Sequence, residues 1–206
     1  MIRIELKDVG KKFGSHWLFK NINLDINQGN KIALLGHNGS GKSTLLQIIS
    51  GFLRPTTGIV NFKNNGTEIV HDDHYKYFSY AAPYMELPEE LTAIEFLEFY
   101  KRHQTFMPGI DTDSIIEISF LTDSRNKIIR SFSSGMKQRL KLACALLSST
   151  PITLLDEPLT NLDDEGVAFY KKMINEYAAE KTVLICSNNV AEETFCCSKK
   201  IQLDLK

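Results

Sequence analysis

The chain has 206 residues, of which 43% are hydrophobic and 24% are charged, and its formal net charge is -1. This length suits one domain, with or without a small lobe, and the near balance of charge argues against a nucleic-acid-binding protein. No apolar run approaches the roughly 20 residues of a membrane span, and the N-terminus lacks the hydrophobic region of a signal peptide. The four cysteines lack metal-ligand spacing and are interpreted as small hydrophobic residues of a reducing compartment. We therefore expect a soluble, cytoplasmic protein.

The first 35 residues predict β-strands. Apolar and polar residues alternate over 2–6 and again over 22–26, and an apolar run follows at 31–35. Phe13 and Gly14 lie between the first two strands. Two interpretations of Phe13 stay open from the residues alone: its ring stacks flat on an adenine base, or it closes the core of a hairpin.

A glycine-rich loop separates the strand at 31–35 from a helical run at 45–49. Its sequence, GHNGSGKST, matches the phosphate-binding pattern G-x-x-x-x-G-K-[ST] at every fixed position. Glycines bring backbone N–H groups close to phosphates, and the helix beginning near Lys42 directs its N–H groups and dipole at the same anion. We expect Lys42 to neutralise the β- and γ-phosphates and Ser43 to ligate Mg²⁺. The predicted nucleotide-binding residues of this loop are Gly36, His37, Asn38, Gly39, Ser40, Gly41, Lys42, Ser43 and Thr44.

The middle of the chain predicts short strands followed by helices. Strands are expected at 59–62, 68–70 and 77–81, and apolar stripes indicate helices at 93–100 and 114–120. We expect residues from about 83 to 130 to form a small helical subdomain.

A second junction between a loop and a helix comes at residues 131–136. The helix is expected to run from about Met136 to Leu147. Serines and a glycine at a helix start form a cap, and the same N–H groups also form an anion site. The residues alone do not choose between these two roles.

A buried strand with two carboxylates at its end is expected at residues 152–158. The apolar run indicates a strand covered on both faces, hence a parallel sheet, and ligands bind beyond the carboxyl ends of such strands. Asp156 suits the ligand shell of Mg²⁺, and Glu157 suits the role of general base toward water. Beyond it we expect a helix at 165–180, a strand at 182–186, a helix at 190–197 and a closing strand at 201–205. The whole chain, 1–206, is interpreted as one α/β domain with an antiparallel N-terminal lobe.

These segments, in this order, resemble the ATP-binding subunit of ABC transporters, a P-loop NTPase, over essentially the whole chain. GHNGSGKST matches the Walker A motif, residues 152–158 match Walker B, and residues 161–163, with Asp163, resemble the dimer-contact D-loop. FSSGMKQR, residues 132–139, resembles the signature motif, whose common form is LSGGQ. Phe13 falls where the family stacks an aromatic ring on adenine. The resemblance implies an ATPase with ATP and Mg²⁺, in which Glu157 is the catalytic base and Lys42 and Asn188 assist.

The resemblance also implies partners. In this family two cassettes pack head to tail, and ATP lies between the Walker A of one and the signature helix of the other. The residues implied in the contact with the partner's ATP are Ser133, Ser134, Gly135 and Met136. A homodimer, or a heterodimer with another cassette, is therefore expected, and a transmembrane permease should dock near residues 83–100. That region contains the aromatic residues Phe96, Phe99 and Tyr100, and the alternative is that these simply pack within the helical lobe. Such a subunit is peripheral on the inner face of the cell membrane.

Two positions depart from the family pattern. No glutamine follows Tyr80 where the Q-loop is expected, and Pro83 or Tyr84 stands there instead. Asn188 stands where the switch histidine is usual; it can donate and accept hydrogen bonds but cannot titrate. One expectation is slower hydrolysis than with histidine. The other is little loss, because positioning and electrostatics dominate phosphoryl transfer.

Two other functions compete with transport. One is a soluble nucleotide-switched regulator with weak ATPase activity, and the other is a small-molecule P-loop kinase, which the signature motif disfavours. A multispanning membrane partner distinguishes the transporter subunit from the regulator.

Overall fold

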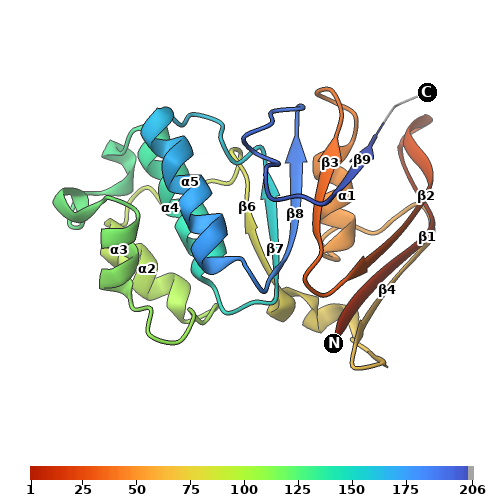
Figure 1. Ribbon diagram of the computed structural model, residues 1–206, viewed down its shortest axis with the longest axis horizontal. Helices are drawn as coiled ribbons and strands as arrows, with labels where there is room; N and C mark the ends of the chain where they lie inside the picture. Colours follow the sequence, from red (N-terminus) through yellow and green to blue (C-terminus); the bar gives the residue numbers. More distant parts are fainter. Residues whose placement is uncertain (204–206) are drawn as a thin grey trace.

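The computed structural model describes residues 1–203, and two β-sheets dominate it (Figure 1). The first sheet is antiparallel, with strand order β2-β1-β4-β5. Its long strands, β1 (Ile2–Phe13) and β2 (His16–Asn27), form a hairpin, and β4 (Thr57–Asn64) pairs with the other edge of β1. The short β5 (Thr67–Glu68) completes the sheet. The predicted antiparallel N-terminal lobe is thus confirmed.

The second sheet is parallel and has the order β6-β7-β8-β3-β9. Its strands are β3 (Lys31–Leu35), β6 (Phe78–Ala81), β7 (Ile152–Asp156), β8 (Thr182–Ser187) and β9 (Lys199–Gln202). Each neighbouring pair is parallel, as the apolar runs predicted. The closing strand expected at 201–205 begins two residues earlier and ends at Gln202, and positions 204 and 205 lie outside the described residues.

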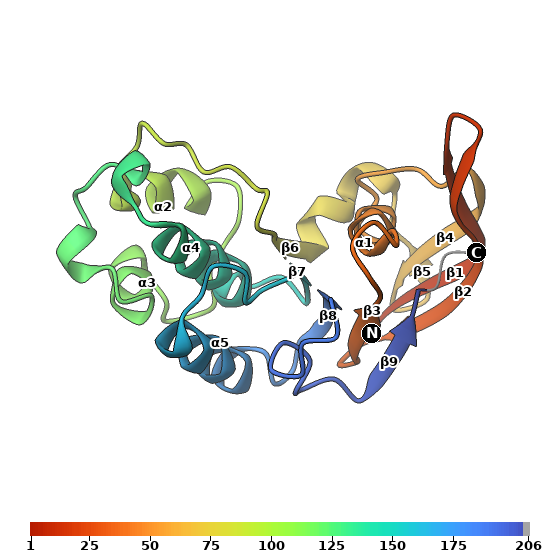
Figure 2. The same ribbon diagram turned by 90° about the horizontal axis from the view of Figure 1, so that it is seen from above.

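The parallel sheet separates two hydrophobic cores. Helix α1 (Lys42–Ile49) lies between the two sheets, whereas α4 (Ser134–Leu147) and α5 (Asp164–Tyr177) cover the opposite face (Figure 2). Strand β8 contributes to both cores because its side chains alternate: Leu184 and Cys186 join the core around α1, and Val183 and Ile185 join the core beneath α4 and α5. Burial on both faces explains why this strand has no polar face in the sequence.

The helical lobe consists of α2 (Ala93–Lys101), α3 (Thr112–Ile118) and short 3₁₀ turns at Thr122–Ser124 and Ile129–Ser131. A further 3₁₀ segment, His71–Tyr77, precedes β6. Helices α2 and α3 share one hydrophobic cluster with α4 and α5. Phe96, expected on the permease-docking surface, is only 6% exposed and belongs to this cluster. That assignment was therefore wrong, because the apolar stripe of α2 faces the core.

The helix expected at 190–197 is absent from the structure; the segment forms successive turns. Its backbone bonds span three residues, from the Glu193 N–H to the Val190 carbonyl and from the Thr194 N–H to the Ala191 carbonyl. β-Branched residues and cysteines are weak helix formers, and tertiary contacts dictate the path here. The Tyr170 hydroxyl donates to the Glu193 carbonyl at 2.6 Å, which fixes this loop on α5.

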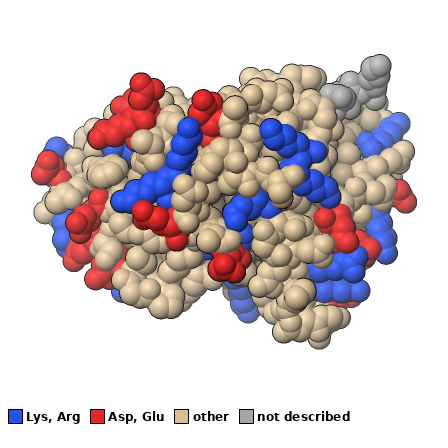
Figure 3. All heavy atoms as spheres, viewed as in Figure 1, with Lys and Arg blue, Asp and Glu red and all other residues tan. Residues whose placement is uncertain are grey.

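The surface carries both signs of charge. On the face shown in Figure 3, Lys and Arg side chains are interspersed with Asp and Glu side chains, which matches the near-zero net charge. Within residues 1–203, no helix combines the length and apolar character needed to cross a membrane.

Candidate functional site

The phosphate loop connects β3 to α1 at the carboxyl end of the parallel sheet. Gly39 and Gly41 have φ angles of 84° and 91°, a left-handed conformation that strains any residue with a Cβ atom. A Cβ atom on Gly41 would also approach the Leu18 and Phe19 side chains to 3.0 Å or less. His37 and Asn38 are exposed, whereas Ser40 is buried and its hydroxyl has no partner. The loop thus wraps tightly around the start of α1.

The Lys42 side chain folds back over this loop. Its ammonium group donates to the carbonyl oxygens of Gly36 at 2.8 Å and His37 at 3.1 Å. It also donates to the amide oxygen of Asn188 at 2.8 Å. All three acceptors are uncharged, so the lysine charge is available to an anion in the loop.

Asn188 links Lys42 to the carboxylate that follows β7. While its Oδ1 atom accepts from Lys42, its Nδ2 atom donates to Glu157 Oε1 at 2.8 Å. Residues from three distant parts of the sequence therefore form one continuous chain of hydrogen bonds. The structure brings together the three residues that the sequence predicted as catalytic.

Glu157 occupies a strained backbone conformation. Its φ is +42°, in the left-handed region, which costs a residue other than glycine on the order of 1–3 kcal/mol. Its own N–H group donates to the Cys186 carbonyl of β8 at 3.0 Å. This bond and those of the following turn hold the carboxylate beside Asn188.

Glu193 also anchors this turn, and the sequence analysis missed it. Its Oε1 atom accepts from the Leu159 N–H at 3.2 Å, and the side chain is buried. Burial raises the pKa of the Glu193 carboxyl above its usual value. Glu193 is the second of two adjacent glutamates, and the wrong helix assignment at 190–197 gave no reason to single it out.

Asp156 fits the role of a magnesium ligand. It is buried at the end of β7, and burial raises the pKa of its carboxyl group, whereas the Ser43 hydroxyl lowers it. Its Oδ2 atom accepts from the Tyr84 hydroxyl at 3.0 Å, but its Oδ1 atom is buried without a hydrogen-bond partner. Mg²⁺ prefers oxygen ligands of this kind, and a cation there would satisfy the unpaired oxygen.

A cavity of about 430 Å³ lies along the phosphate loop. Its lining is Phe13, Leu18, Asn38, Gly39, Gly41, Lys42, Ser43, Thr44 and Glu157. Phe13 is 56% exposed at this cavity, so it does not close a hairpin core. An exposed ring beside the phosphate loop is available to stack on a base.

The start of α4 has the capping role that the sequence left open, and its serines stay accessible. Ser133 caps the helix by accepting from the Met136 N–H at 3.2 Å, while Ser133 and Ser134 stay exposed. The helix begins at Ser134, two residues before the predicted start. Asp163 likewise caps α5, where it accepts from the Gly166 N–H at 2.9 Å.

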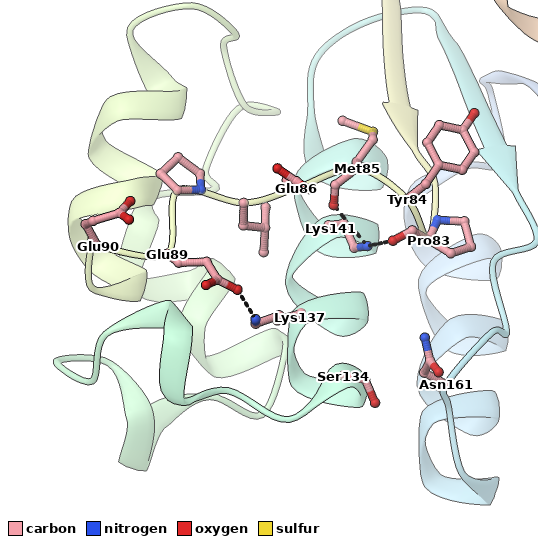
Figure 4. Close-up of a pocket in the computed structure, with 12 residues that line it drawn as sticks. Pro83, Tyr84, Met85, Glu86, Glu89, Glu90, Ser134, Lys137, Lys141 and Asn161 are labelled. Atoms are coloured by element: carbon pink, nitrogen blue, oxygen red, sulfur yellow. Dashed lines mark hydrogen bonds and ion pairs between the residues drawn. The ribbon is translucent and has the colours of Figure 1, made fainter.

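The start of α4 lines a different cavity from the phosphate loop. Ser134 and Asn161 lie on this second cavity of about 770 Å³, together with the loop 83–90 (Figure 4). None of Ser133, Ser134, Gly135 and Met136 lines the phosphate-loop cavity. Within the described residues the two predicted anion sites therefore lie at separate cavities.

Comparison with known proteins identifies the family. The family model described as ABC transporter matches residues 19–160. The chain belongs to the ABC transporter family. This match spans the phosphate loop, the α4 start and the β7 carboxylates described above.

Two curated relatives and one solved structure agree with this family. The chain is 31% identical, over 92% of its length, to the uncharacterized ABC transporter ATP-binding protein YdbJ of Bacillus subtilis. It has the same identity, over the same share of its length, to the cytochrome c biogenesis ATP-binding export protein CcmA of Nitrosococcus oceani. It spans 62% of the length of YdbJ and 87% of that of CcmA. The dimeric, post-hydrolysis structure of the ATP-binding cassette MJ0796 bound to ADP and Pi matches 98% of this chain and 94% of that one, with a TM-score of 0.81 and 25% identity.

The Lys42 contacts generate a first prediction. Lys42→Ala should weaken ATP binding about 10- to 100-fold, because charge-assisted hydrogen bonds contribute about 1.5–3 kcal/mol. Isothermal titration calorimetry measures the affinity, and Lys63→Ala, on an exposed position of β4, is the matched control. Unchanged affinity in Lys42→Ala would show that this loop does not hold the phosphates.

Proposed function

We propose that this chain binds and hydrolyses ATP as the nucleotide-binding subunit of an ABC transporter and powers a separate membrane permease. The observation that carries the proposal is that Lys42 and Glu157 both line the phosphate-loop cavity and are joined by hydrogen bonds through Asn188. This arrangement places a cation for phosphate and a carboxylate for water at one cavity. The family match supports the nucleotide as ATP.

Each group of residues at the cavity has a separate role in hydrolysis. The phosphate loop and Lys42 hold the triphosphate, and Phe13 stacks on its base. Held by Ser43 and Asp156, Mg²⁺ would supply neutralisation of the negative phosphate oxygens. Glu157 accepts a proton from the attacking water. The Asn188 Nδ2 group carries two N–H donors: one is donated to Glu157, and the other is free to be donated to the terminal phosphate, while Oδ1 accepts from Lys42. This role of Asn188 requires no titrating proton.

The separation of the phosphate loop from the start of α4 supports a paired active form, in which each chain supplies one of the two anion sites. The N–H groups of the first turn of α4, at the exposed Ser134 and the half-buried Gly135, and the helix dipole suit the γ-phosphate of a nucleotide bound to another cassette. Such pairing stabilises the dimer only while the γ-phosphate is attached, because the released phosphate no longer joins the two halves. The partner is a second copy of this chain or another cassette.

Blocking hydrolysis tests this pairing. Glu157→Gln should lower turnover by about 10²–10⁴-fold, since it removes the general base, and should accumulate as a dimer with ATP and Mg²⁺. Light scattering after gel filtration measures the mass. The double variant Glu157→Gln/Ser134→Asp should bind ATP yet remain monomeric, because the added carboxylate repels the partner's γ-phosphate. A Glu157→Gln protein that stays monomeric with bound ATP would contradict ATP-driven pairing.

The Asn188 position decides between the two expectations about rate. We predict that Asn188→His raises the ATP turnover number several-fold, because an imidazolium adds positive charge beside the γ-phosphate. Asn188→Ala should lower it, since both hydrogen bonds disappear. Steady-state phosphate release measures both variants. Equal turnover of Asn188→His and the parent would mean that the asparagine replaces histidine without loss.

An apolar groove beside β6 is the proposed docking site of the permease. The groove has a volume of about 510 Å³. Its lining is Gln47, Ser50, Phe52, Tyr75, Phe78, Ser79, Tyr80, Tyr84, Met85, Tyr100 and Gln104. Phe52 is 88% exposed at its edge, and exposed aromatic side chains around an apolar groove are typical of protein-binding sites. Docking there would hold the chain on the inner face of the cell membrane.

A charge placed at the groove tests the docking. Phe52→Glu should abolish retention of a multispanning membrane protein when the tagged chain is purified from solubilised membranes. Ile59→Glu, at a 54% exposed position of β4 outside the groove, is the matched control and should retain it. Retention by both variants would place the permease contact elsewhere, whereas a soluble partner alone would favour the regulator.

A further inference from the structure

Tyr84 is one of the two residues, with Pro83, that stand where the family pattern has a glutamine. Its hydroxyl contacts the proposed magnesium ligand. It donates to Asp156 Oδ2 at 3.0 Å. The Tyr80 hydroxyl lies 2.5 Å from the Tyr84 hydroxyl. A tyrosine has a single hydroxyl proton, and that of Tyr84 is directed to Asp156. Tyr80 must therefore donate to Tyr84, which gives an ordered chain from Tyr80 through Tyr84 to Asp156.

Both tyrosines are held by rigid surroundings. Tyr80 belongs to β6 and pairs in register with Leu154 of β7, the strand that ends at Asp156. The loop that carries Tyr84 is fixed by the buried Lys141 of α4, whose ammonium group donates to the Ala82 and Pro83 carbonyl oxygens at 2.9 Å each. Figure 4 shows the Lys141 side chain reaching this loop from α4. The same ammonium group donates to the Met85 carbonyl oxygen at 3.4 Å, so the backbone is held on both sides of Tyr84.

The two oxygens of Asp156 have different surroundings. Oδ2 accepts the Tyr84 hydrogen bond, and Oδ1 is buried without a partner. A hydrogen bond to one oxygen fixes the plane and rotation of a carboxylate. Groups that bond to metal ligands in this way typically change metal affinity 10- to 100-fold.

We propose that Tyr84 is the positioning residue of the magnesium site: its hydroxyl holds Asp156 through Oδ2 so that the unpaired Oδ1 is presented to the cation. Tyr84 thereby acts on the metal only through Asp156. A glutamine in its place would act on the metal by binding it directly. The inference rests on the proposed ATP-binding function of this cavity. It assigns to this chain a residue that the family pattern does not contain.

Magnesium-dependent ATP binding tests the role of Tyr84. The parent carries Glu157→Gln, which prevents ATP depletion during the measurement. ATP affinity is first measured in EDTA, and Mg²⁺ is then titrated into the ATP complex. Tyr84→Phe should leave ATP affinity in EDTA unchanged and lower the affinity for Mg²⁺ about 10- to 100-fold. The side chain is 54% exposed, so loss of one oxygen leaves the core intact.

Two further variants separate positioning from a general effect on structure. Tyr75→Phe removes a hydroxyl from a 62% exposed tyrosine of the same groove and should change neither affinity. Tyr80→Phe removes the more distant link and should lower the Mg²⁺ affinity less than Tyr84→Phe does. Equal Mg²⁺ affinity in Tyr84→Phe and the parent would overturn the inference, as would ATP binding in the parent that does not respond to Mg²⁺. Absence of any ATP binding by the parent would instead overturn the proposed function.

Discussion

The site depends on two hydrogen bonds at the end of the parallel sheet, by which one neutral amide joins a lysine to a carboxylate. Asn188 accepts from Lys42 and donates to Glu157, both at 2.8 Å. A lysine ammonium and a carboxylate this near would otherwise be free to form an ion pair, in which each neutralises the other. The amide keeps them apart, so that the cation stays available to phosphate and the carboxylate stays available to water. The fold meets this requirement by ending β3, β7 and β8 side by side, in the order β7-β8-β3.

The rest of the core serves to hold those strand ends. Alternate side chains of β8 enter the two hydrophobic cores, so both layers of helices resist movement of the strand. The strained backbone at Glu157 is held by the Cys186 carbonyl on one side and by the turn anchored at Glu193 on the other. Strain of this kind persists only where the surroundings determine the backbone, and it is common at active sites.

The loop after β6 joins the nucleotide cavity to the outer surface. Tyr84 bonds to Asp156 and also lines the apolar groove. Lys141 of α4 holds the backbone before it, at Ala82 and Pro83, and after it, at Met85. A partner seated in the groove would therefore touch the side chain that holds the metal ligand. Helix α4 begins beside the exposed serines at 133 and 134, so one helix connects these serines with the same loop. These contacts give a physical path between the phosphate-loop side of the sheet, the start of α4 and the apolar groove.

The sequence by itself determined the parts that local pattern governs. The glycine-rich loop, the two-sided burial of β7 and β8 and the carboxylates at Asp156 and Glu157 follow from residue type and spacing, because phosphate binding and strand burial each demand a particular local order. Only the tertiary structure decided what long-range contacts govern. Residues 190–197 form turns bound to Tyr170 and not a helix. Phe96 is buried within the helical lobe, and Tyr84, not Pro83, has the side chain that bonds to Asp156. Short segments have nearly equal local preferences for several conformations, so their final form is set by partners that lie far away in the sequence.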